Sequence, residues 1–353
     1  MKSSLQHFKQ NKPFIILDIG TNPMGDPILA DRMVRAAAQT GALVKFQAYR
    51  VSELLHPNHP AYSMLLLEET PSSLLSQMID LTQSLSAPCG ITVFSPEGIR
   101  LAKEKKVDFI KIASGDITYH LLIKMAAETG IPLILSTGCA DQKDVDSALK
   151  VARIAGAKLL ALLHCVSLYP APIEASNLAV MDNWLKLALP AGFSDHSLGI
   201  EASQAALALG AVALERHFTV DPKLPGGDND ISITETEAKR LMDFANYPHS
   251  EKMDISSVNK TPLWGKIPKR ILKGEDPLVL RRHLVAKHPL KKGQKVRTDD
   301  FLYLRVGRNL CGPPIGADVD LTNSELTRDL DLMEILKTGD LRPVNPNTHF
   351  GGV

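Results

Sequence analysis

AGFSDHSLGIEASQAALALGAVALERHFT, residues 191–219, contains two short apolar segments separated by a longer amphipathic one. The short segments are typical of buried strands. The segment between them has apolar residues at helical spacing and ends in Gly210, a residue common just after a helix. A strand, a helix and a second strand in this order form the repeating unit of a parallel sheet. Each predicted strand ends near a histidine, His196 in the first and His217 in the second.

The same alternation runs from about residue 14 to about residue 247. The predicted strands are 14–20, 43–48, 89–95, 108–113, 132–138, 158–166, 191–196 and 213–219. The clearest helical segments are 27–41, 71–86, 120–130, 142–156 and 200–210. Strands this apolar are buried on both faces, which indicates a parallel sheet covered by helices. Eight such units predict an α/β fold, a (β/α)8 TIM barrel, ahead of an eight-stranded doubly wound sheet.

The pattern changes after residue 248, where a polar, Lys-rich segment with Pro and Gly is typical of a linker. From His283 onward, short β-rich runs interrupted by Gly and Pro predict a small, mostly β domain. We expect a catalytic barrel over residues 1–250, a linker over 251–282 and a second domain over 283–353. Such a small domain is expected to pack over an active site rather than to contain one.

The composition excludes several classes of protein. The chain has 353 residues, with 40 Lys and Arg against 39 Asp and Glu, so it lacks the positive charge of a nucleic-acid-binding protein. No apolar run reaches the roughly 18 residues of a membrane span, and the N-terminal stretch does not resemble a signal peptide. We expect a cytoplasmic protein that binds neither nucleic acid nor membrane. Cys89, Cys139, Cys165 and Cys311 are widely spaced, which predicts buried reduced thiols.

Polar side chains gather at the C-terminal ends of seven of the eight predicted strands. A TIM barrel places its catalytic groups at these ends. The candidates are Asp18, Asn22, Lys45, Gln47, Lys111, Ser114, Asp116, Ser136, Thr137, His164, Ser167, Tyr169, Ser194, Asp195, His196, Glu215, His217 and Asp228. Polar residues at the ends of so many strands predict one site at this end of the barrel.

Lys45 and Lys111 lie in the apolar strands LVKFQA and FIKIAS, where an unpaired charge would cost several kcal/mol. Each lysine therefore needs an anion. Two cations facing one cavity, beside serine hydroxyls, suit a small phosphorylated carboxylate. The alternative is that each lysine pairs with an internal carboxylate such as Asp18 or Glu215.

His196 and His217, taken singly, would more often be ordinary core histidines. Together, on adjacent strands with carboxylates nearby, they indicate part of a divalent metal site. Two imidazoles plus water and substrate oxygens suit Mn²⁺ or Mg²⁺ better than a structural zinc, which takes four protein ligands. Asp195 is a candidate hydrogen-bond partner for a metal-binding ring.

Seven segments resemble those of the sialic acid synthases, in the same order and spacing, and cover nearly the whole barrel. They are VKFQ (44–47), KIASGDI (111–117), ILSTG (134–138), LLHCVSLYPAP (162–172), GFSDHSLGIEAS (192–203), LGAVALERHFTVD (209–221) and PGGDNDISIT (225–234). These enzymes condense phosphoenolpyruvate with an N-acetylated amino sugar. The resemblance implies a transferase that uses N-acetylmannosamine or a related sugar, and makes a nine-carbon 2-keto acid and phosphate.

The resemblance also implies roles for most candidates. His196 and His217 would bind Mn²⁺ or Mg²⁺, which would polarise the aldehyde of the open-chain sugar. Phosphoenolpyruvate would be held by Lys45, Lys111, Ser114, Ser136, Ser167 and Ser194. The sugar would be contacted by Gln47, Asp116, Tyr169 and Asp228. Asp116 would also handle a proton at the sugar or at the attacking water.

The loop LDIGTNPMG, residues 17–25, departs from the family pattern AEIGxNHxG. Asp18 replaces a glutamate and Pro23 replaces a histidine, whereas Asn22 and Gly25 are retained. Because this loop borders the sugar site, the departure bears on which sugar is used. Asp18 remains a catalytic candidate and Asn22 a substrate-binding one.

Residues 284–307 resemble the start of an antifreeze-like domain, also called a SAF domain, which has a β-clip fold. In the sialic acid synthases this domain reaches across a domain-swapped homodimer and lends an arginine to the partner's sugar site. Arg305 is the best candidate for that arginine, and Arg308 is the alternative.

Three other functions stay open. Another phosphoenolpyruvate–aldose condensation, giving a shorter sugar acid, is disfavoured by the antifreeze-like segment. Metal-dependent hydrolysis usually needs further protein ligands beside two imidazoles. A catalytically inactive, sugar-binding paralogue is favoured by the changes at Asp18 and Pro23 and disfavoured by the retained lysines and histidines.

Overall fold

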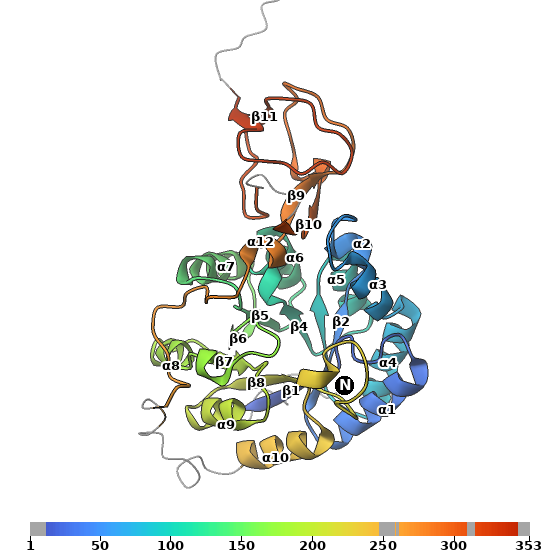
Figure 1. Ribbon diagram of the computed structural model, residues 1–353, viewed down its shortest axis with the longest axis vertical. Coiled ribbons are helices and arrows are strands. Elements are labelled where there is room, and N and C mark those ends of the chain that lie inside the picture. Colours follow the sequence, from blue (N-terminus) through green and yellow to red (C-terminus); the bar gives the residue numbers. More distant parts are fainter. Residues whose placement is uncertain (1–11, 247–257, 259–260, 309–314, 345–353) are drawn as a thin grey trace, which may run out of the picture.

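The computed structural model describes residues 12–246, 258, 261–308 and 315–344. It contains a closed ring of eight parallel strands in sequence order (Figure 1). The strands are β1 (Phe14–Asp18), β2 (Leu43–Ala48), β3 (Cys89–Val93), β4 (Phe109–Ile112), β5 (Leu133–Ser136), β6 (Leu159–Cys165), β7 (Ala191–Ser194) and β8 (Ala213–His217). Because β8 pairs with β1, the barrel prediction is confirmed and the doubly wound alternative is wrong.

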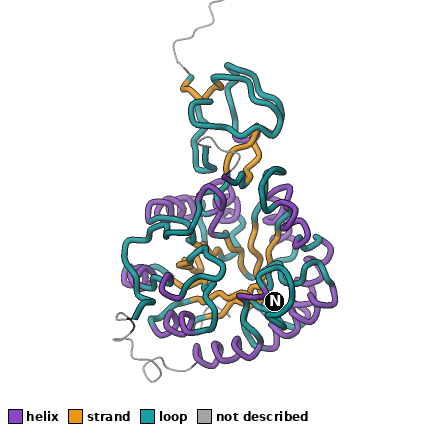
Figure 2. Tube along the Cα trace, viewed as in Figure 1, coloured by secondary structure: helices purple, strands orange, loops and turns teal. Residues whose placement is uncertain are grey.

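Helices surround the ring on its outer side (Figure 2). The five predicted helices are α1 (Pro27–Gln39), α4 (Ser72–Ser84), α6 (His120–Glu128), α7 (Gln142–Ile154) and α9 (Glu201–Ala208). The layer is completed by α5 (Pro96–Glu104), α8 (Ala179–Lys186) and α10 (Glu235–Asn246). Two short helices, α2 (Val51–Leu54) and α3 (Tyr62–Glu68), lie in the connection after β2.

Side chains at the helix starts fix the loops at the C-terminal ends of the barrel strands. Before α1, the Asp26 carboxylate accepts hydrogen bonds from the backbone N–H groups of Ile28 and Leu29. Before α7, Asp141 and Asp144 each accept a hydrogen bond from the other's backbone N–H. These caps satisfy N–H groups that the first helical turn leaves unpaired, so the loops after β1 and β5 are well anchored.

The barrel interior is built in layers. Its floor is apolar and consists of Ile16, Leu43, Phe109, Ile134, Ala161, Leu163 and Ala213. Residues two positions apart on a strand point the same way, so the next inward layer is Asp18, Lys45, Lys111, Ser136, Cys165, Ser194 and Glu215. The ring of Phe109 fills the space beside Gly90, where a Cβ would lie 2.0 Å from it. The packed floor therefore supports a polar layer above it.

Beyond the barrel, two small antiparallel sheets form a mostly β unit at one end of the molecule (Figure 1). They pair β9 (His283–Ala286) with β10 (Phe301–Leu304), and β11 (Ser324–Leu326) with β12 (Leu341–Pro343). Their separate apolar core contains Leu284, Ala286, Leu290, Val296, Phe301, Leu321, Leu326, Leu330 and Leu336. The expected linker contains α12 (Pro277–Leu280). The expected boundaries at 1, 250, 251 and 353 lie outside the described residues and stay predictions.

Two further expectations concern the thiols and the membrane. Cys89, Cys139 and Cys165 are free and buried, which confirms the prediction for these three. Cys311 lies outside the described residues. Within the described part of the chain, every helix is too short or too polar to cross a bilayer.

His283 should make the protein less stable in mild acid. It is only 5% exposed, and burial, together with Arg281, lowers the pKa of its ring to about 4. In the unfolded chain the pKa is about 6.5, so protonation favours unfolding. The free energy of unfolding should therefore be undiminished above pH 6.5 and fall by up to about 3 kcal/mol as the pH decreases to about 4.

This pH dependence can be measured by chemical denaturation at a series of pH values. His283→Gln should flatten the decrease between pH 6.5 and 4. The matched control is His288→Gln, since the His288 side chain is 50% exposed. Equal slopes for His283→Gln and the wild type would contradict the assignment.

Candidate active site

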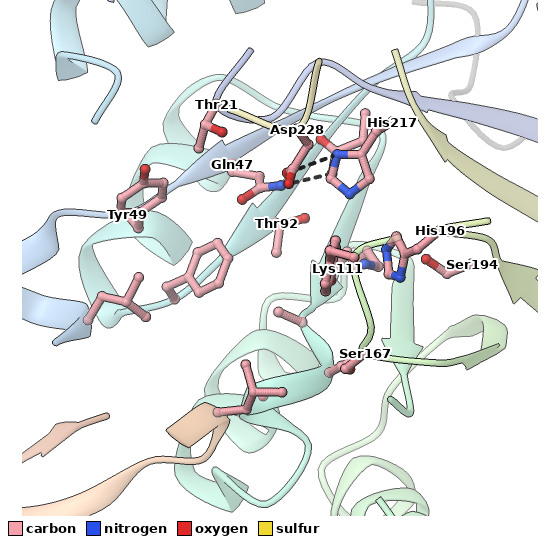
Figure 3. A pocket seen from close by; sticks show the side chains of 18 of the residues that line it. Thr21, Gln47, Tyr49, Thr92, Lys111, Ser167, Ser194, His196, His217 and Asp228 are labelled. Carbon is pink, nitrogen blue, oxygen red and sulfur yellow. Dashed lines mark hydrogen bonds and ion pairs between the residues drawn. The ribbon is translucent and has the colours of Figure 1, made fainter. Parts of the chain in front are cut away.

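A cavity of about 440 Å³ lies at the C-terminal ends of the barrel strands (Figure 3). Of the fifteen residues with a predicted catalytic, substrate-binding or metal-binding role, twelve line it. They are Asp18, Lys45, Gln47, Lys111, Ser114, Ser167, Tyr169, Ser194, His196, His217, Asp228 and Arg305. Asn22, Asp116 and Ser136 are buried nearby but do not line the cavity. The site thus lies where the strand-end pattern predicts it.

The two lysines pair with internal carboxylates. Nζ of Lys45 lies 2.6 Å from Asp18 and 4.0 Å from Glu215, and it donates a 2.7 Å hydrogen bond to Thr92. Nζ of Lys111 lies 2.8 Å from Glu215. All four charged side chains are at least nine-tenths buried. The structure therefore shows the internal pairing that the sequence left as an alternative.

Burial and pairing act in opposite directions on these groups. Burial alone would raise the pKa of Asp18, but Lys45 and, less strongly, His217 lower it to about 2. Burial would also raise the pKa of Glu215, but Lys111 and Lys45 lower it. Burial would lower the pKa of Lys111, and Glu215 outweighs this and raises it. Asp18, Glu215 and Lys111 are therefore charged at neutral pH.

Serine hydroxyls surround the charged cluster. Ser194 donates a 3.0 Å hydrogen bond to Glu215, and Oγ of Ser114 accepts a 2.9 Å hydrogen bond from the backbone N–H of Gly138. A Cβ on Gly138 would lie 2.2 Å from Oγ of Ser167, so only glycine lets these hydroxyls come together. Ser136 is fully buried, and its Oγ has no hydrogen-bond partner within the described residues.

His196 and His217 lie close together, with ring centroids 5.3 Å apart. Nδ1 of His196 is 2.9 Å from the carbonyl oxygen of Val166, and Nδ1 of His217 is 3.4 Å from Asp228 (Figure 3). Burial lowers the pKa of His217, so this ring is neutral. In His196 the effect of burial is outweighed by Cys165, which raises the pKa to about 9.

This histidine pair fits a divalent ion that keeps open coordination positions. With their ring centroids 5.3 Å apart, the two imidazoles lie close enough that one nitrogen of each would hold the same ion. No group of three His, Cys, Asp or Glu side chains arranged to hold a metal occurs in the described part of the chain. Water and substrate oxygens would have to complete the coordination. Binding would also displace a proton from His196.

The loop that carries Asp228 is held by Asn22. The amide of Asn22 donates 2.8 Å hydrogen bonds to the carbonyl oxygen of Phe218 and to Ser232. Its carbonyl oxygen accepts a 2.7 Å hydrogen bond from the backbone N–H of Asp228. Asn22 thus positions Asp228 and has no surface in the cavity, contrary to its predicted contact with substrate. Gln47 does line the cavity and donates a 2.9 Å hydrogen bond to Asp18.

Arg305 enters the cavity from the C-terminal β unit. Its guanidinium lies 5.9 Å from the centroid of Phe94, and Nε is buried with no hydrogen-bond partner in the described residues. Arg308, the alternative, is exposed and pairs with Asp276 outside the cavity. In this single chain Arg305 reaches the barrel mouth of its own subunit. The expected exchange of the domain between two copies stays a prediction.

Two carboxylates lie elsewhere than predicted. Asp116 is fully buried behind the cavity and accepts a 2.6 Å hydrogen bond from Nε of Arg282, so it has no access to a sugar. Asp195 does not support a histidine ring. It accepts a 2.8 Å hydrogen bond from Arg216 and others from Ser197 and Ser203. Both carboxylates neutralise buried arginines, which the sequence pattern did not reveal.

Comparisons with known proteins place the chain in a family. The sequence profile of the NeuB family matches residues 33–250. The chain belongs to the NeuB family. The resemblance to the sialic acid synthases is therefore confirmed.

Several NeuB relatives match along most of their length. The N,N'-diacetyllegionaminic acid synthase of Legionella pneumophila is 32% identical, over 90% of this chain and 91% of the relative. The structure of the spore coat polysaccharide biosynthesis protein SpsE from Bacillus subtilis superposes with a TM-score of 0.78 and 27% identity, over 93% of this chain and 94% of that one. The N-acetylneuraminic acid synthetase of Leptospira borgpetersenii, solved with citrate, gives a TM-score of 0.65 and 33% identity, over 71% and 90%.

The NeuB cavity also contains residues that the sequence did not single out. Thr92 comes from β3, the one strand without a predicted candidate, and Cys165 comes from β6. Met64, Leu65 and Glu68 come from α3. Thr92 could have been found from its place in the inward layer, two residues beyond Gly90, whereas no spacing rule places an irregular connection such as that of α3.

Proposed function

We propose that this NeuB chain condenses phosphoenolpyruvate with an N-acylated amino sugar, giving a nine-carbon 2-keto acid and phosphate. The observation that carries the proposal is one cavity that combines paired lysines, serine hydroxyls and two adjacent histidines. Two of the relatives are synthases of N,N'-diacetyllegionaminic and N-acetylneuraminic acids, which supports an acylated amino sugar as the acceptor.

The serine end of the cavity suits the phosphate and carboxylate of phosphoenolpyruvate. An ammonium group has three donors, so Lys111 can donate to Glu215 and to a ligand at once. The hydroxyls of Ser114 and Ser167 add neutral donors beside it, and Ser194, whose hydroxyl donates to Glu215, offers an acceptor oxygen. Ser136 is assigned the same role because its buried hydroxyl has no hydrogen-bond partner within the described residues; its side chain does not line the cavity, so this contact requires a movement of the side chain.

The charge of the cavity supports a role for a divalent ion. Four carboxylates line it, Asp18, Glu68, Glu215 and Asp228, against Lys45, Lys111, Arg305 and the protonated ring of His196, so the side chains leave no excess of positive charge. A phosphorylated carboxylate brings several further negative charges, so its binding needs more positive charge than these side chains supply. Mn²⁺ or Mg²⁺ held by His196 and His217 would supply that charge and act as a Lewis acid on the sugar aldehyde.

The opposite end of the cavity suits the sugar. Gln47, Tyr169 and Asp228 offer hydrogen-bonding groups, and the guanidinium of Arg305, whose Nε has no partner within the described residues, suits the carbonyl oxygen of an acylamino group. In the reaction, C3 of phosphoenolpyruvate forms a bond to the aldehyde carbon, whose oxygen takes up a proton. Water adds to C2 and loses a proton, and cleavage of the C–O bond then releases phosphate. The chain's contribution is to hold the two reactants in line.

Phosphate release tests the proposal directly. We expect release from phosphoenolpyruvate only when an acylated amino sugar and Mn²⁺ or Mg²⁺ are both present, and its loss with a chelator. His196→Ala and His217→Ala should each abolish this release, because each removes one metal ligand. The control is His288→Ala, which should leave the rate of phosphate release unchanged because the His288 side chain is exposed to solvent.

Other results would identify the alternatives. Release with short aldoses but with no acylamino sugar would indicate another phosphoenolpyruvate–aldose synthase. Sugar binding without release under any condition would indicate an inactive paralogue. Chelator-insensitive release would contradict the metal assignment.

The proposed setting of the enzyme follows the same resemblance. It is a cytoplasmic homodimer that acts on small molecules, with a SAF-type antifreeze-like domain over residues 283–353. If the two copies exchange this domain, as the resemblance implies, the partner's Arg305 takes the place that the chain's own Arg305 occupies in the single chain. Mixing inactive Arg305→Ala with inactive His217→Ala protein tests the exchange, because only an arginine supplied by the partner restores one intact site.

A further inference from the structure

Residues 263–282, here called the strap, run across the barrel mouth instead of forming a free spacer. The backbone N–H groups of Leu178 and Ala179 donate to the carbonyl oxygens of Leu263 and Trp264 at 2.9 and 2.8 Å. Farther along, Nζ of Lys269 donates a 3.0 Å hydrogen bond to the carbonyl oxygen of Cys165. Lys269 is 1% exposed, so the strap places a buried charged side chain against a strand of the site.

Glu275 of the strap holds the serine end of the cavity. Its Oε1 accepts hydrogen bonds from the backbone N–H groups of Cys139, at 2.7 Å, and Ser167, at 2.8 Å. Its Oε2 accepts a 2.7 Å hydrogen bond from Leu272 within the strap. One 7% exposed carboxylate therefore ties together the loops after β5 and β6. Those loops carry Ser167 and Gly138, which is bonded to Ser114.

Arg282 of the strap holds the opposite end. Its side chain is fully buried and donates a hydrogen bond to Asp116. It also donates hydrogen bonds to the carbonyl oxygens of Glu53, Phe94 and Tyr303, at 2.8, 2.8 and 2.9 Å. These partners belong to the connection after β2, the end of β3, the end of β4 and the C-terminal β unit. The hydrogen bonds of the Arg282 guanidinium therefore fix the unit that delivers Arg305 against three barrel loops.

The strap and Arg305 both pack closely against Gly115. A Cβ on Gly115 would lie 2.4 Å from the carbonyl oxygen of Leu280 and 2.7 Å from Nη2 of Arg305. Leu280 and Arg305 both line the cavity. The strap thus forms part of the cavity wall, and its position decides where Arg305 lies.

We propose that the strap is a positioning element with two separate anchors, Glu275 for the phosphate end of the active site and Arg282 for the sugar end. The names of the two ends rest on the proposed function. The anchoring itself rests on the contacts above. Neither residue contacts a substrate, and each acts through the backbone and side chains to which it is hydrogen-bonded.

The kinetic test compares Glu275→Ala with Arg282→Gln. Glu275→Ala should raise KM for phosphoenolpyruvate about tenfold or more, since hydrogen bonds to a charged group are lost, and should leave KM for the sugar within about twofold. Arg282→Gln should raise KM for the sugar about tenfold or more and leave KM for phosphoenolpyruvate within about twofold. Glu275→Gln and Arg282→Lys, which keep part of the hydrogen bonding, should each recover part of the loss. Arg308→Gln, which removes an exposed ion pair to the strap residue Asp276, should change neither KM.

Hydrogen exchange gives a readout that does not depend on the reaction. Glu275→Ala should speed exchange at residues 137–140 and 165–168, and Arg282→Gln at residues 53–56 and 94–96. If Arg282→Gln does not fold, Arg282→Lys serves in its place. The two-anchor proposal would be overturned if either variant changed the exchange rates of both regions and both KM values together, or if it changed none of them. Wild-type protein without sugar-dependent phosphate release would instead overturn the proposed function, and the exchange pattern would still decide the strap.

Discussion

Lys45→Met should abolish sugar-dependent phosphate release and destabilise the barrel at the same time. The ammonium of Lys45 is fully buried and lies 2.6 Å from Asp18, so its removal leaves an uncompensated carboxylate in the interior. Breaking a buried ion pair in this way costs about 3–5 kcal/mol. Loss of a cation at the reacting centre should reduce turnover by roughly 10²–10³-fold or more. Chemical denaturation and the phosphate assay measure the two effects.

The double variant Asp18→Asn with Lys45→Met separates these effects. Removing both charges avoids the buried unpaired carboxylate, so most of the stability should return. Activity should not return, because the cation is still absent. If the double variant regained activity together with stability, Lys45 would be a structural residue only.

Arg216→Met should cause the largest loss of stability away from the cavity. Nη1 of Arg216 donates 2.8 and 2.7 Å hydrogen bonds to Asp195 and to the carbonyl oxygen of Gly199, and Nη2 donates a 2.7 Å bond to the carbonyl oxygen of Ser197. Both Arg216 and Asp195 are at most 2% exposed. The substitution leaves the buried charge of Asp195 without its counter-ion and removes a donor from two carbonyl groups, so we expect the free energy of unfolding to fall by about 3–5 kcal/mol.

Urea denaturation of the variant measures this loss. Arg35→Met is the matched control, because Arg35 makes an ion pair with Asp31 on the surface of α1, where such a pair contributes little. A loss for Arg216→Met no larger than for Arg35→Met would show that the buried network is not the source of stability.

The fold could be predicted from the sequence because every barrel strand is buried on both of its faces. The buried runs around Ile16, Ile134 and Leu162 are apolar without alternation, and amphipathic helices separate them. The connection after β2 could not be predicted in this way. Helix α3 has no buried residue, so no hydrophobic pattern marks it.

For the candidate site, too, the regular part of the barrel could be predicted and the tertiary contacts could not. Residues at strand ends, such as Lys45, His196 and His217, were predicted because parallel strands bring their ends to one edge. The pairing of Asp116 and Asp195 could not be predicted because their partners, Arg282 and Arg216, are distant in sequence or point away from the barrel interior. A pairing of that kind depends on tertiary packing, and the sequence alone does not contain a local signal for it.

The layered construction of the barrel has a consequence for the evolution of specificity. The charged groups that would act on phosphoenolpyruvate stand on β1, β2, β4 and β8, whereas Met64, Leu65 and Glu68 enter the cavity from the α3 connection. An exchange of that connection alone would reshape one wall and leave the inward charges in register. New acceptor sugars could therefore arise by grafting a single surface loop, without a change to any residue of the barrel interior.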